Sequence, residues 1–335
     1  MIGELVRPAE LGRLLAAATG EPRWRELSAS LISGGKSNLT FELTSPAGAL
    51  VLRRPPTGDL PSGAHDMGRE VAVQRALAPT AVPVARIVLW HPEPEPLGVP
   101  FYVMEKVAGH VIRGELPPSY ADTPAQRVAM SDALVDVLVG LHALDPVAVG
   151  LGDLGRPAGF MARQVDRWGK RGRAPSITAL GAALAERIPQ SPPPSVIHGD
   201  LRLDNCITDP DDPGRIAAVL DWELATVGDP LTDLGLLLFY WREPGEPQSD
   251  LVPTVTALPG FPGREHLVER YATRSGRDPG DIAFYRAFAH LKFAVIAEGI
   301  AARVASGAMA GQDFGALDGE AVRIAEAGLD LLRKG

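Results

Sequence analysis

The chain has 335 residues, of which 45% are hydrophobic and 22% charged, the balance of an ordinary globular protein with a sizeable core. Its formal net charge of −8 argues against a general nucleic-acid-binding protein, which needs clustered lysine and arginine side chains to neutralise phosphates. A single cysteine excludes an internal disulfide and a cysteine metal cluster, and no apolar run is long enough to span a membrane. Because the N-terminus also lacks a secretory leader pattern, we expect a cytoplasmic protein without a membrane or nucleic-acid partner, in an oligomeric state that the sequence leaves open.

Strand patterns dominate the first hundred residues. Pro8 to Thr19 carries leucines at helical spacing and stops before Gly20, which predicts a short amphipathic helix. Residues 67–77 predict a second helix. Runs rich in β-branched and aromatic residues, bounded by turn residues, predict strands. The predicted strands are residues 29–33, 39–43, 49–54, 87–90 and 101–104.

Helical spacing dominates the rest of the chain. Thr123 followed by Pro124 marks the start of a long helix, in which Leu134, Leu138 and Leu141 recur at helical intervals. Further helices are predicted at residues 158–170, 175–188, 230–241, 263–275, 281–304 and 318–333, and one strand-like island at residues 195–221. The pattern therefore predicts an α+β protein with a β-rich N-terminal lobe, residues 1–105, and a mainly helical C-terminal lobe, residues 106–335.

The strongest chemical pattern is the segment HGDLRLDN, residues 198–205, followed by the tripeptide Asp221-Trp222-Glu223. Phosphoryl transfer needs a base near the acceptor hydroxyl, metal ions that bridge the phosphates and a positive clamp. An aspartate five residues before an asparagine can supply the base and a metal ligand from one loop, and a later strand-end aspartate adds a hard oxygen ligand suited to Mg²⁺. The order and strand context are those of a kinase catalytic loop. Ordinary surface turns would have to produce both motifs by chance.

This pattern, with Gly199 where protein kinases carry arginine, resembles the aminoglycoside phosphotransferase family and its choline kinase-like and homoserine kinase-like relatives. The resemblance covers roughly residues 30–305. It implies a bilobal protein-kinase-like fold, ATP or GTP as the donor, Mg²⁺ and a small hydroxylated acceptor.

The same resemblance implies roles for four residues of the two motifs. Asp200 would orient or deprotonate the acceptor hydroxyl, and Arg202 would touch the transferring phosphate. Asn205 and Asp221 would bind the metal ions.

The turn between the first two strands resembles the nucleotide-covering loop of the family. Glycine lets backbone N–H groups approach phosphate closely, and a lysine adds positive charge. A plain hairpin turn is the alternative interpretation. The residues expected to contact the nucleotide here are Gly34, Gly35, Lys36 and Ser37.

The third strand departs from the usual kinase pattern, which places a phosphate-binding lysine there. This chain has Arg53 and Arg54 instead, and Arg53 is the better match, with Glu70 of the following helix as its expected ion-pair partner. A shift of one residue in the strand register would exchange the two arginines. Arginine keeps the charge but presents a planar fork rather than a point-charge ammonium.

Residues 101–107, FYVMEKV, resemble the strand and hinge where adenine docks. Glu105 and Val107 would contribute main-chain hydrogen bonds to the base.

Other notable residues favour structural interpretations. His142 at a helix end is expected to be a hydrogen-bonding partner, and Cys206 a small core residue. Asp229 and Asp233 resemble a helix cap and a loop tie. Trp222 fits either the core or the edge of an acceptor pocket.

The identity of the acceptor stays open. Residues 51–70, VLRRPPTGDLPSGAHDMGRE, resemble the kinase-like domain that stands alone in bacteria or is fused to acyl-CoA dehydrogenases, which implies a hydroxylated acyl thioester. An aminoglycoside-like cation would suit the acidic C-terminal lobe. An anionic CoA ester would need basic residues, for which the candidates are Arg163, Arg167, Lys170, Arg171 and Arg173. The rival from another class is a pseudokinase, favoured by the arginine at position 53 and opposed by the retained Asp200, Asn205 and Asp221.

Overall fold

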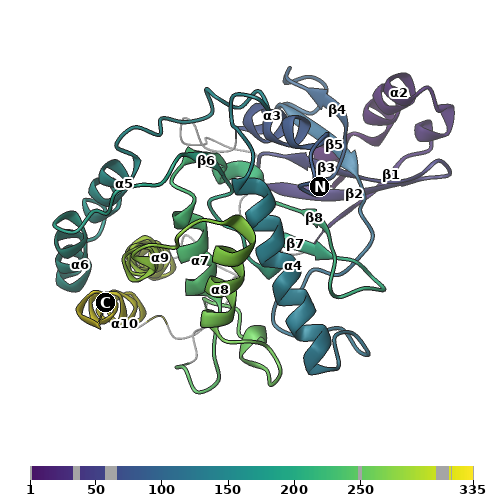
Figure 1. The fold of residues 1–335 in the computed structure, drawn as a ribbon. Helices are drawn as coiled ribbons and strands as arrows, with labels where there is room; N and C mark the ends of the chain where they lie inside the picture. Colours follow the sequence, from purple (N-terminus) through teal and green to yellow (C-terminus); the bar gives the residue numbers. More distant parts are fainter. Residues whose placement is uncertain are drawn as a thin grey trace. The chain divides into compact units, whose positions relative to one another are not determined.

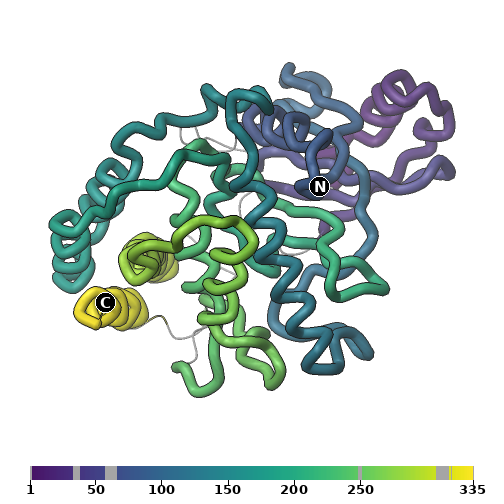
Figure 2. Tube along the Cα trace, in the orientation of Figure 1, coloured from purple at the N-terminus to yellow at the C-terminus, as the bar shows by residue number. Residues whose placement is uncertain are grey.

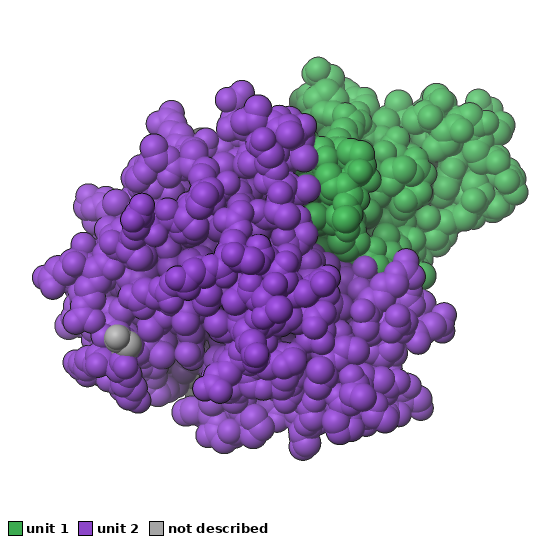
Figure 3. Space-filling view, viewed as in Figure 1, with its two compact units in different colours: residues 1–108, 217–223 green, residues 109–216, 224–335 purple. Residues whose placement is uncertain are grey.

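The structure, a computed structural model, describes residues 2–32, 38–56, 66–247, 251–306, 317 and 319–334. It divides into two compact units, coloured separately in Figure 3, and each is described by itself. Unit 1 comprises residues 1–108 and 217–223, and unit 2 comprises residues 109–216 and 224–335. Within the described ranges no helix combines the length and apolarity needed to cross a membrane.

Unit 1 is built on a five-stranded antiparallel sheet with the strand order β1-β2-β3-β5-β4 (Figure 1). Its strands are β1 (Ser28–Leu31), β2 (Leu39–Ser45), β3 (Gly48–Arg54), β4 (Ile87–His91) and β5 (Phe101–Glu105). Its helices are α1 (Ile2–Val6), α2 (Pro8–Thr19), the short 3-10 helix η1 (Pro22–Arg25) and α3 (Met67–Leu77).

The two faces of this sheet are covered by different helices. Successive side chains of a strand point to opposite faces. Leu50 and Leu52 of β3 belong to a buried cluster with Leu15 of α2, whereas Val51 belongs to a second cluster with Val71 of α3. The hydrophobic alternation along β3 therefore fixes which face each of its side chains occupies.

The same alternation separates the two arginines at the end of β3. Arg53 follows Val51 on the α3 face, and Arg54 follows Leu52 on the α2 face. The Arg54 guanidinium is buried, and its Nη1 donates to the carbonyl oxygens of Leu5 at 2.6 Å and Leu97 at 3.3 Å. Arg54 is thus a structural residue.

Unit 2 is mainly helical. Its first helix is α4 (Pro124–His142), which begins with a capping box between Thr123 and Gln126. The other helices are α5 (Phe160–Gly169), α6 (Pro175–Ala185), α7 (Leu231–Tyr240), α8 (Arg264–Ser275), α9 (Ile282–Ala305) and α10 (Glu320–Lys334). Short elements complete it: β6 (Ser195–Ile197), η2 (Leu203–Asn205), β7 (Cys206–Thr208), β9 (Thr226–Gly228) and η4 (Val255–Ala257). Two more, β8 (Ile216–Val219) and η3 (Trp222–Leu224), cross the boundaries between the units.

Helix α9 is the centre of the helical packing in unit 2. It packs against α7, α6 and α10, and Figure 2 shows α10, at the yellow end of the chain, beside it. Helix α7 approaches α9 so closely at Gly235 that a Cβ there would lie 2.6 Å from the backbone of Tyr285. Each predicted helix from α5 to α10 begins and ends within three residues of its expected position, and the predicted α+β class is confirmed.

Candidate active site

Arg53 lies at the centre of a buried group of charges in unit 1. Its Nε is 2.9 Å from Oε2 of Glu70, and its Nη2 is 2.5 Å from Oδ1 of Asp221. Glu70 is fully buried and accepts hydrogen bonds from the Tyr102 hydroxyl at 2.8 Å and the Asn38 amide at 3.0 Å. The predicted ion pair between the third strand and the following helix is therefore confirmed.

The electrostatics of this group keep Arg53 charged. Burial acts to lower the pKa of Arg53, but the charges of Glu70, Asp221 and Glu223 outweigh it and raise that pKa above its usual value. Burial raises the pKa of Glu70 to about 7, against the opposing effects of Arg53 and of the Tyr102 hydrogen bond. The result is a fixed guanidinium beside the carboxylate of Asp221.

Asp221 occupies an unusual backbone conformation at the end of β8. Its φ of +65° lies in the left-handed region, which non-glycine residues adopt chiefly where the surroundings impose it, often at functional sites. The next residue, Trp222, is buried, and its indole N–H donates to the Val219 carbonyl at 3.0 Å. Trp222 is thus a core residue that fixes the turn, which settles the alternative left open by the sequence. Within the described part of the chain, the second carboxylate oxygen of Asp221 has no partner, so it can serve a hard cation.

The structure does not test the other predicted nucleotide contacts. Gly34, Gly35, Lys36 and Ser37 lie outside the described residues. Glu105 ends β5, where its N–H donates to the Arg86 carbonyl at 3.0 Å and its carboxylate pairs with the Arg86 guanidinium at 2.5 Å. Val107 packs, partly buried, against the α3-side cluster. Their main-chain contacts to a nucleotide stay predictions.

In unit 2 the segment HGDLRLDN, residues 198–205, turns sharply after β6. Gly199 has a φ of +84°, and a Cβ there would lie 2.9 Å from the carbonyl oxygen of Leu224. Both the backbone conformation and the close approach favour glycine. The glycine that distinguishes this motif from that of protein kinases is therefore required by the local packing.

Asp233 of α7 holds the turn at His198 and Gly199 through hydrogen bonds to its backbone. Its two carboxylate oxygens accept hydrogen bonds from the N–H groups of His198 at 2.7 Å and Gly199 at 2.8 Å, and Oδ2 lies 3.3 Å from Nε2 of His142. Burial opposes the ionisation of Asp233, but the hydrogen bond and charge of His142 and the interactions with His198 hold its pKa below the usual value. His142 is buried and also bonds the Tyr271 hydroxyl at 2.9 Å. The expected loop tie and the structural histidine are both confirmed.

The carboxylate of Asp200 is oriented by Asn205. The Asn205 amide nitrogen donates to the Asp200 carbonyl at 2.8 Å and to its Oδ2 at 3.0 Å, and the Asp200 N–H bonds Nδ1 of His198 at 3.1 Å. Because Nδ2 faces Asp200, the amide oxygen of Asn205 points elsewhere and accepts no hydrogen bond within the described ranges. The loop thus presents a fixed carboxylate and an open hard oxygen ligand.

Arg202 is partly buried beside Asp200. Its Nη1 is 3.0 Å from Oδ2 of Asp204, its Nε is 3.5 Å from Oδ2 of Asp200, and its guanidinium carbon is 4.6 Å from the centre of the Tyr240 ring. Burial raises the pKa of Asp204, and the charge of Arg202 acts against that shift. The expected contact of Arg202 with a transferring phosphate stays a prediction, since the structure shows it engaged by Asp204 and Tyr240.

Lys292 is a residue at this site that the sequence interpretation missed. It comes from the middle of α9, and its Nζ donates to the carbonyl of Gly199 at 2.8 Å. The available signal was a single lysine between Leu291 and Phe293 in an otherwise apolar stretch of helix. Cys206, in contrast, is fully buried, and burial raises the pKa of its thiol, as expected for a core residue.

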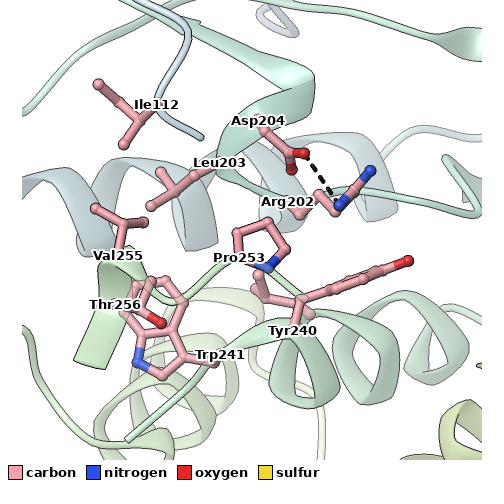
Figure 4. Close-up of a pocket in the computed structure, with 10 residues that line it drawn as sticks. Ile112, Arg202, Leu203, Asp204, Tyr240, Trp241, Pro253, Val255 and Thr256 are labelled. Carbon is pink, nitrogen blue, oxygen red and sulfur yellow. Dashed lines mark ion pairs between the residues drawn. The ribbon is translucent and has the colours of Figure 1, made fainter. Parts of the chain in front are cut away.

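A small pocket lies beside Arg202 (Figure 4). The Arg202–Asp204 ion pair forms one wall, and the Tyr240 ring lies next to it. Burial, with the charge of Asp200, raises the pKa of the Tyr240 hydroxyl well above its usual value. The remaining lining residues are mostly apolar: Ile112, Leu203, Leu237, Trp241, Pro253, Val255 and Thr256.

Comparison with known proteins agrees with this geometry. Residues 28–286 match the model of the phosphotransferase enzyme family. The rat acyl-CoA dehydrogenase family member 11 is 35% identical over 318 residues, which are 92% of this chain and 40% of that protein. The chain therefore spans about two fifths of the length of this curated relative.

Solved structures agree as well. A putative aminoglycoside phosphotransferase from Ralstonia eutropha is 34% identical, with a TM-score of 0.76 over 92% of this chain and 93% of that one. A thermostable aminoglycoside phosphotransferase mutant in complex with ADP and hygromycin B has a TM-score of 0.62 at 18% identity, covering 97% and 98% of the two chains, which shows a shared kinase-like fold. By its family model and by its similarity over nearly the whole length of the Ralstonia protein, the chain belongs to the phosphotransferase enzyme family.

Proposed function

We propose that this protein transfers the γ-phosphate of ATP to a hydroxyl group of a small molecule. The observation that carries the proposal is the Asp200 carboxylate, fixed by the Asn205 amide at 3.0 Å on a turn that Asp233 holds by two backbone hydrogen bonds. A carboxylate oriented in this way can accept the proton of an acceptor hydroxyl as that oxygen attacks phosphorus. Residues 1–105 would bind the nucleotide, and residues 106–335 would carry catalysis and acceptor binding.

The donor set suits magnesium. Within the described residues no three acidic, histidine or cysteine side chains gather into a metal cage. Mg²⁺ usually takes only one or two protein oxygens, and its other ligands are water and substrate phosphates. The open oxygen of Asn205 in unit 2 is one ligand of that kind, and the open oxygen of Asp221 in unit 1 is another, each considered within its own unit. When bound, Mg²⁺ neutralises charge on the phosphates.

On the nucleotide side, Arg53 is proposed to replace the usual lysine. Its Nε–Glu70 contact of 2.9 Å fixes the guanidinium in the way a kinase lysine is fixed by its helix glutamate. Arginine can bind phosphate oxygens through two parallel hydrogen bonds. The residue change therefore keeps a clamp rather than removing one.

The pocket favours a hydroxyacyl acceptor over an aminoglycoside. The indole N–H of Trp241 donates to the Pro262 carbonyl at 2.8 Å, and the Thr256 hydroxyl donates to the Arg242 carbonyl at 3.0 Å. Asp204 is paired with Arg202, so the lining offers no unpaired carboxylate to an ammonium group. An apolar chain fits such a lining.

A hydroxylated acyl thioester also agrees with the name of the acyl-CoA dehydrogenase relative. The CoA portion is anionic, and the exposed basic residues on and after α5 offer it a counter-charge. These residues are Arg163, Arg167, Lys170, Arg171 and Arg173.

The test is phosphate transfer from ATP with Mg²⁺ to a panel of hydroxyacyl-CoA esters, amino alcohols and aminoglycosides, with the product mass confirmed. Asp200→Asn should leave ATP affinity within a few-fold and lower kcat by about 10²-fold or more, the usual scale for losing acid–base assistance. Asp330→Asn, on the exposed face of α10, is the matched control and should behave as the parent. Equal, negligible transfer by parent and Asp200→Asn to every acceptor would favour the pseudokinase interpretation.

The acyl assignment has its own measurement. In a series of hydroxyacyl-CoA esters of increasing chain length, kcat/KM should rise about fourfold for each methylene that enters the pocket, because burying one methylene contributes about 0.8 kcal/mol. Faster transfer to an aminoglycoside than to any ester of the series would reject the acyl acceptor and leave phosphate transfer intact.

A further inference from the structure

We propose that Lys292 is a catalytic residue, whose ammonium group binds the phosphoryl group during its transfer at Asp200. The inference rests on the proposed phosphotransferase function and adds to it a cation contributed by α9. Its starting point is the hydrogen bond of 2.8 Å from Nζ to the carbonyl of Gly199, the residue directly before Asp200.

The hydrogen bond that Lys292 makes does not by itself require a charged donor. A neutral donor would satisfy one carbonyl oxygen, whereas a partly buried ammonium loses hydration that a single neutral acceptor does not replace. Burial lowers the pKa of Lys292, and the charges of Asp200 and Asp233 act against that shift. In the described part of the chain no carboxylate lies within ion-pair distance of Nζ.

An ammonium group has three donors, and Gly199 takes one of them. The other two N–H groups have no hydrogen-bond acceptor among the residues that the structure describes. A cation with two open donors beside the catalytic carboxylate is suited to an anion that arrives with the substrates. The phosphoryl oxygens are that anion, because charge spreads over them as transfer proceeds.

The other cation next to Asp200 is committed elsewhere. Arg202 is 3.0 Å from the Asp204 carboxylate and stacks on Tyr240 along the pocket wall. The resemblance of the motif implies the phosphate contact for Arg202, whereas the contacts favour Lys292.

In the transfer step, a bond forms between the acceptor oxygen and the γ-phosphorus, and the bond from that phosphorus to the bridging oxygen breaks. The acceptor proton goes to the Asp200 carboxylate, and ADP leaves with the bridging oxygen and its electron pair. Lys292 stays protonated throughout, since it stabilises charge and exchanges no proton.

Three substitutions separate charge from hydrogen bonding. Lys292→Met removes both, Lys292→Gln keeps a neutral donor for Gly199, and Lys292→Arg keeps the charge. Methionine and glutamine variants should both lose about 10²-fold in kcat, the scale for removing one preorganised donor to a transition-state charge. KM for ATP should stay within a few-fold, and Lys292→Arg should recover at least about tenfold over Lys292→Met. Lys334→Met, at the exposed end of α10, is the matched control.

Two results would overturn the proposed role of Lys292. A kcat of Lys292→Gln within about threefold of the parent would mean that Lys292 only donates to Gly199, and the proposal falls. It falls too if Lys292→Met and Lys292→Arg lose kcat, ATP affinity and Tm together, since that pattern indicates a structural role.

A second readout does not require an acceptor to be known. ADP with Mg²⁺ and aluminium fluoride mimics the transferring phosphoryl group, and calorimetry measures whether the fluoride tightens ADP binding. We expect tightening in the parent and its loss in Lys292→Met, with ADP affinity alone unchanged. If no acceptor in the panel is phosphorylated but this difference is found, the proposed acceptor class fails while Lys292 retains its role. Equal tightening in both proteins, or none in the parent, overturns the proposal.

Discussion

Replacing Asp233 by alanine tests the structural basis of the catalytic turn. The carboxylate is almost fully buried and accepts the N–H groups of His198 at 2.7 Å and Gly199 at 2.8 Å. Hydrogen bonds to a charged acceptor contribute about 1.5–3 kcal/mol each, so losing both should lower the free energy of unfolding by about 3–6 kcal/mol. That is a large part of the about 5–15 kcal/mol that stabilises a typical domain.

Asp233→Asn refines the same test. Asparagine retains one carbonyl oxygen and turns its NH₂ group toward the second backbone N–H, so one bond is lost and the penalty should be about half that of alanine. Urea denaturation followed by circular dichroism at constant pH gives both values. Asp330→Ala, on the exposed face of α10, should change stability by less than about 0.5 kcal/mol.

The loss in kcat should also be larger in Asp233→Ala than in Asp233→Asn, because Asp200 follows the turn that Asp233 holds. A loss below about 1 kcal/mol in Asp233→Ala would refute the reasoning, since two buried N–H groups would then be shown to tolerate the loss of their acceptor.

Two further predictions concern the helices of unit 2. Burial lowers the pKa of His290 from 6.5 to about 4. The contribution of the neutral imidazole to stability is therefore complete above pH 6.5 and is lost as the pH falls through about 4. The free energy of unfolding, measured from about pH 7.5 to about pH 4, should decline less steeply in His290→Gln than in the parent. An unchanged profile would exclude His290 as the group responsible. Gly235→Ala should cost about 1–3 kcal/mol, because its Cβ would lie 2.6 Å from the α9 backbone, whereas Gly140→Ala in α4, with nothing within 4 Å, should leave Tm equal or higher. Equal effects of the two glycine substitutions on Tm would contradict the close approach of α7 and α9.

The sequence was sufficient to predict the longer helices and strands of the sheet, because these elements have strong local signals. The capping box at Thr123 and Gln126 fixes the start of α4, and the alternation along β3 fixes the faces of the sheet. The short β9 and the five-residue α1 have no such signal, since their formation depends on contacts far along the chain.

Some residues of the candidate site could also be predicted from the sequence, and others could not. Asp200, Asn205 and Asp221 were recognised because their spacing is a local property of the chain. Lys292 lies 92 residues beyond Asp200 in sequence, so only the packing of α9 against the catalytic turn brings them together. The engagement of Arg202 by Asp204 and Tyr240 was likewise beyond the sequence, because it depends on side-chain direction and not on spacing.

The contact between Arg54 of β3 and Leu5 of α1 makes the formation of helix α1 depend on the earlier formation of the sheet. A five-residue helix does not persist alone in water, and its last carbonyl groups have no partners within the helix. Arg54 supplies one such partner at 2.6 Å, and a cation is also favoured at that end of a helix. Helix α1 can therefore persist only once β3 has been incorporated into the sheet, and in hydrogen exchange its amides should open no later than those of β3 itself.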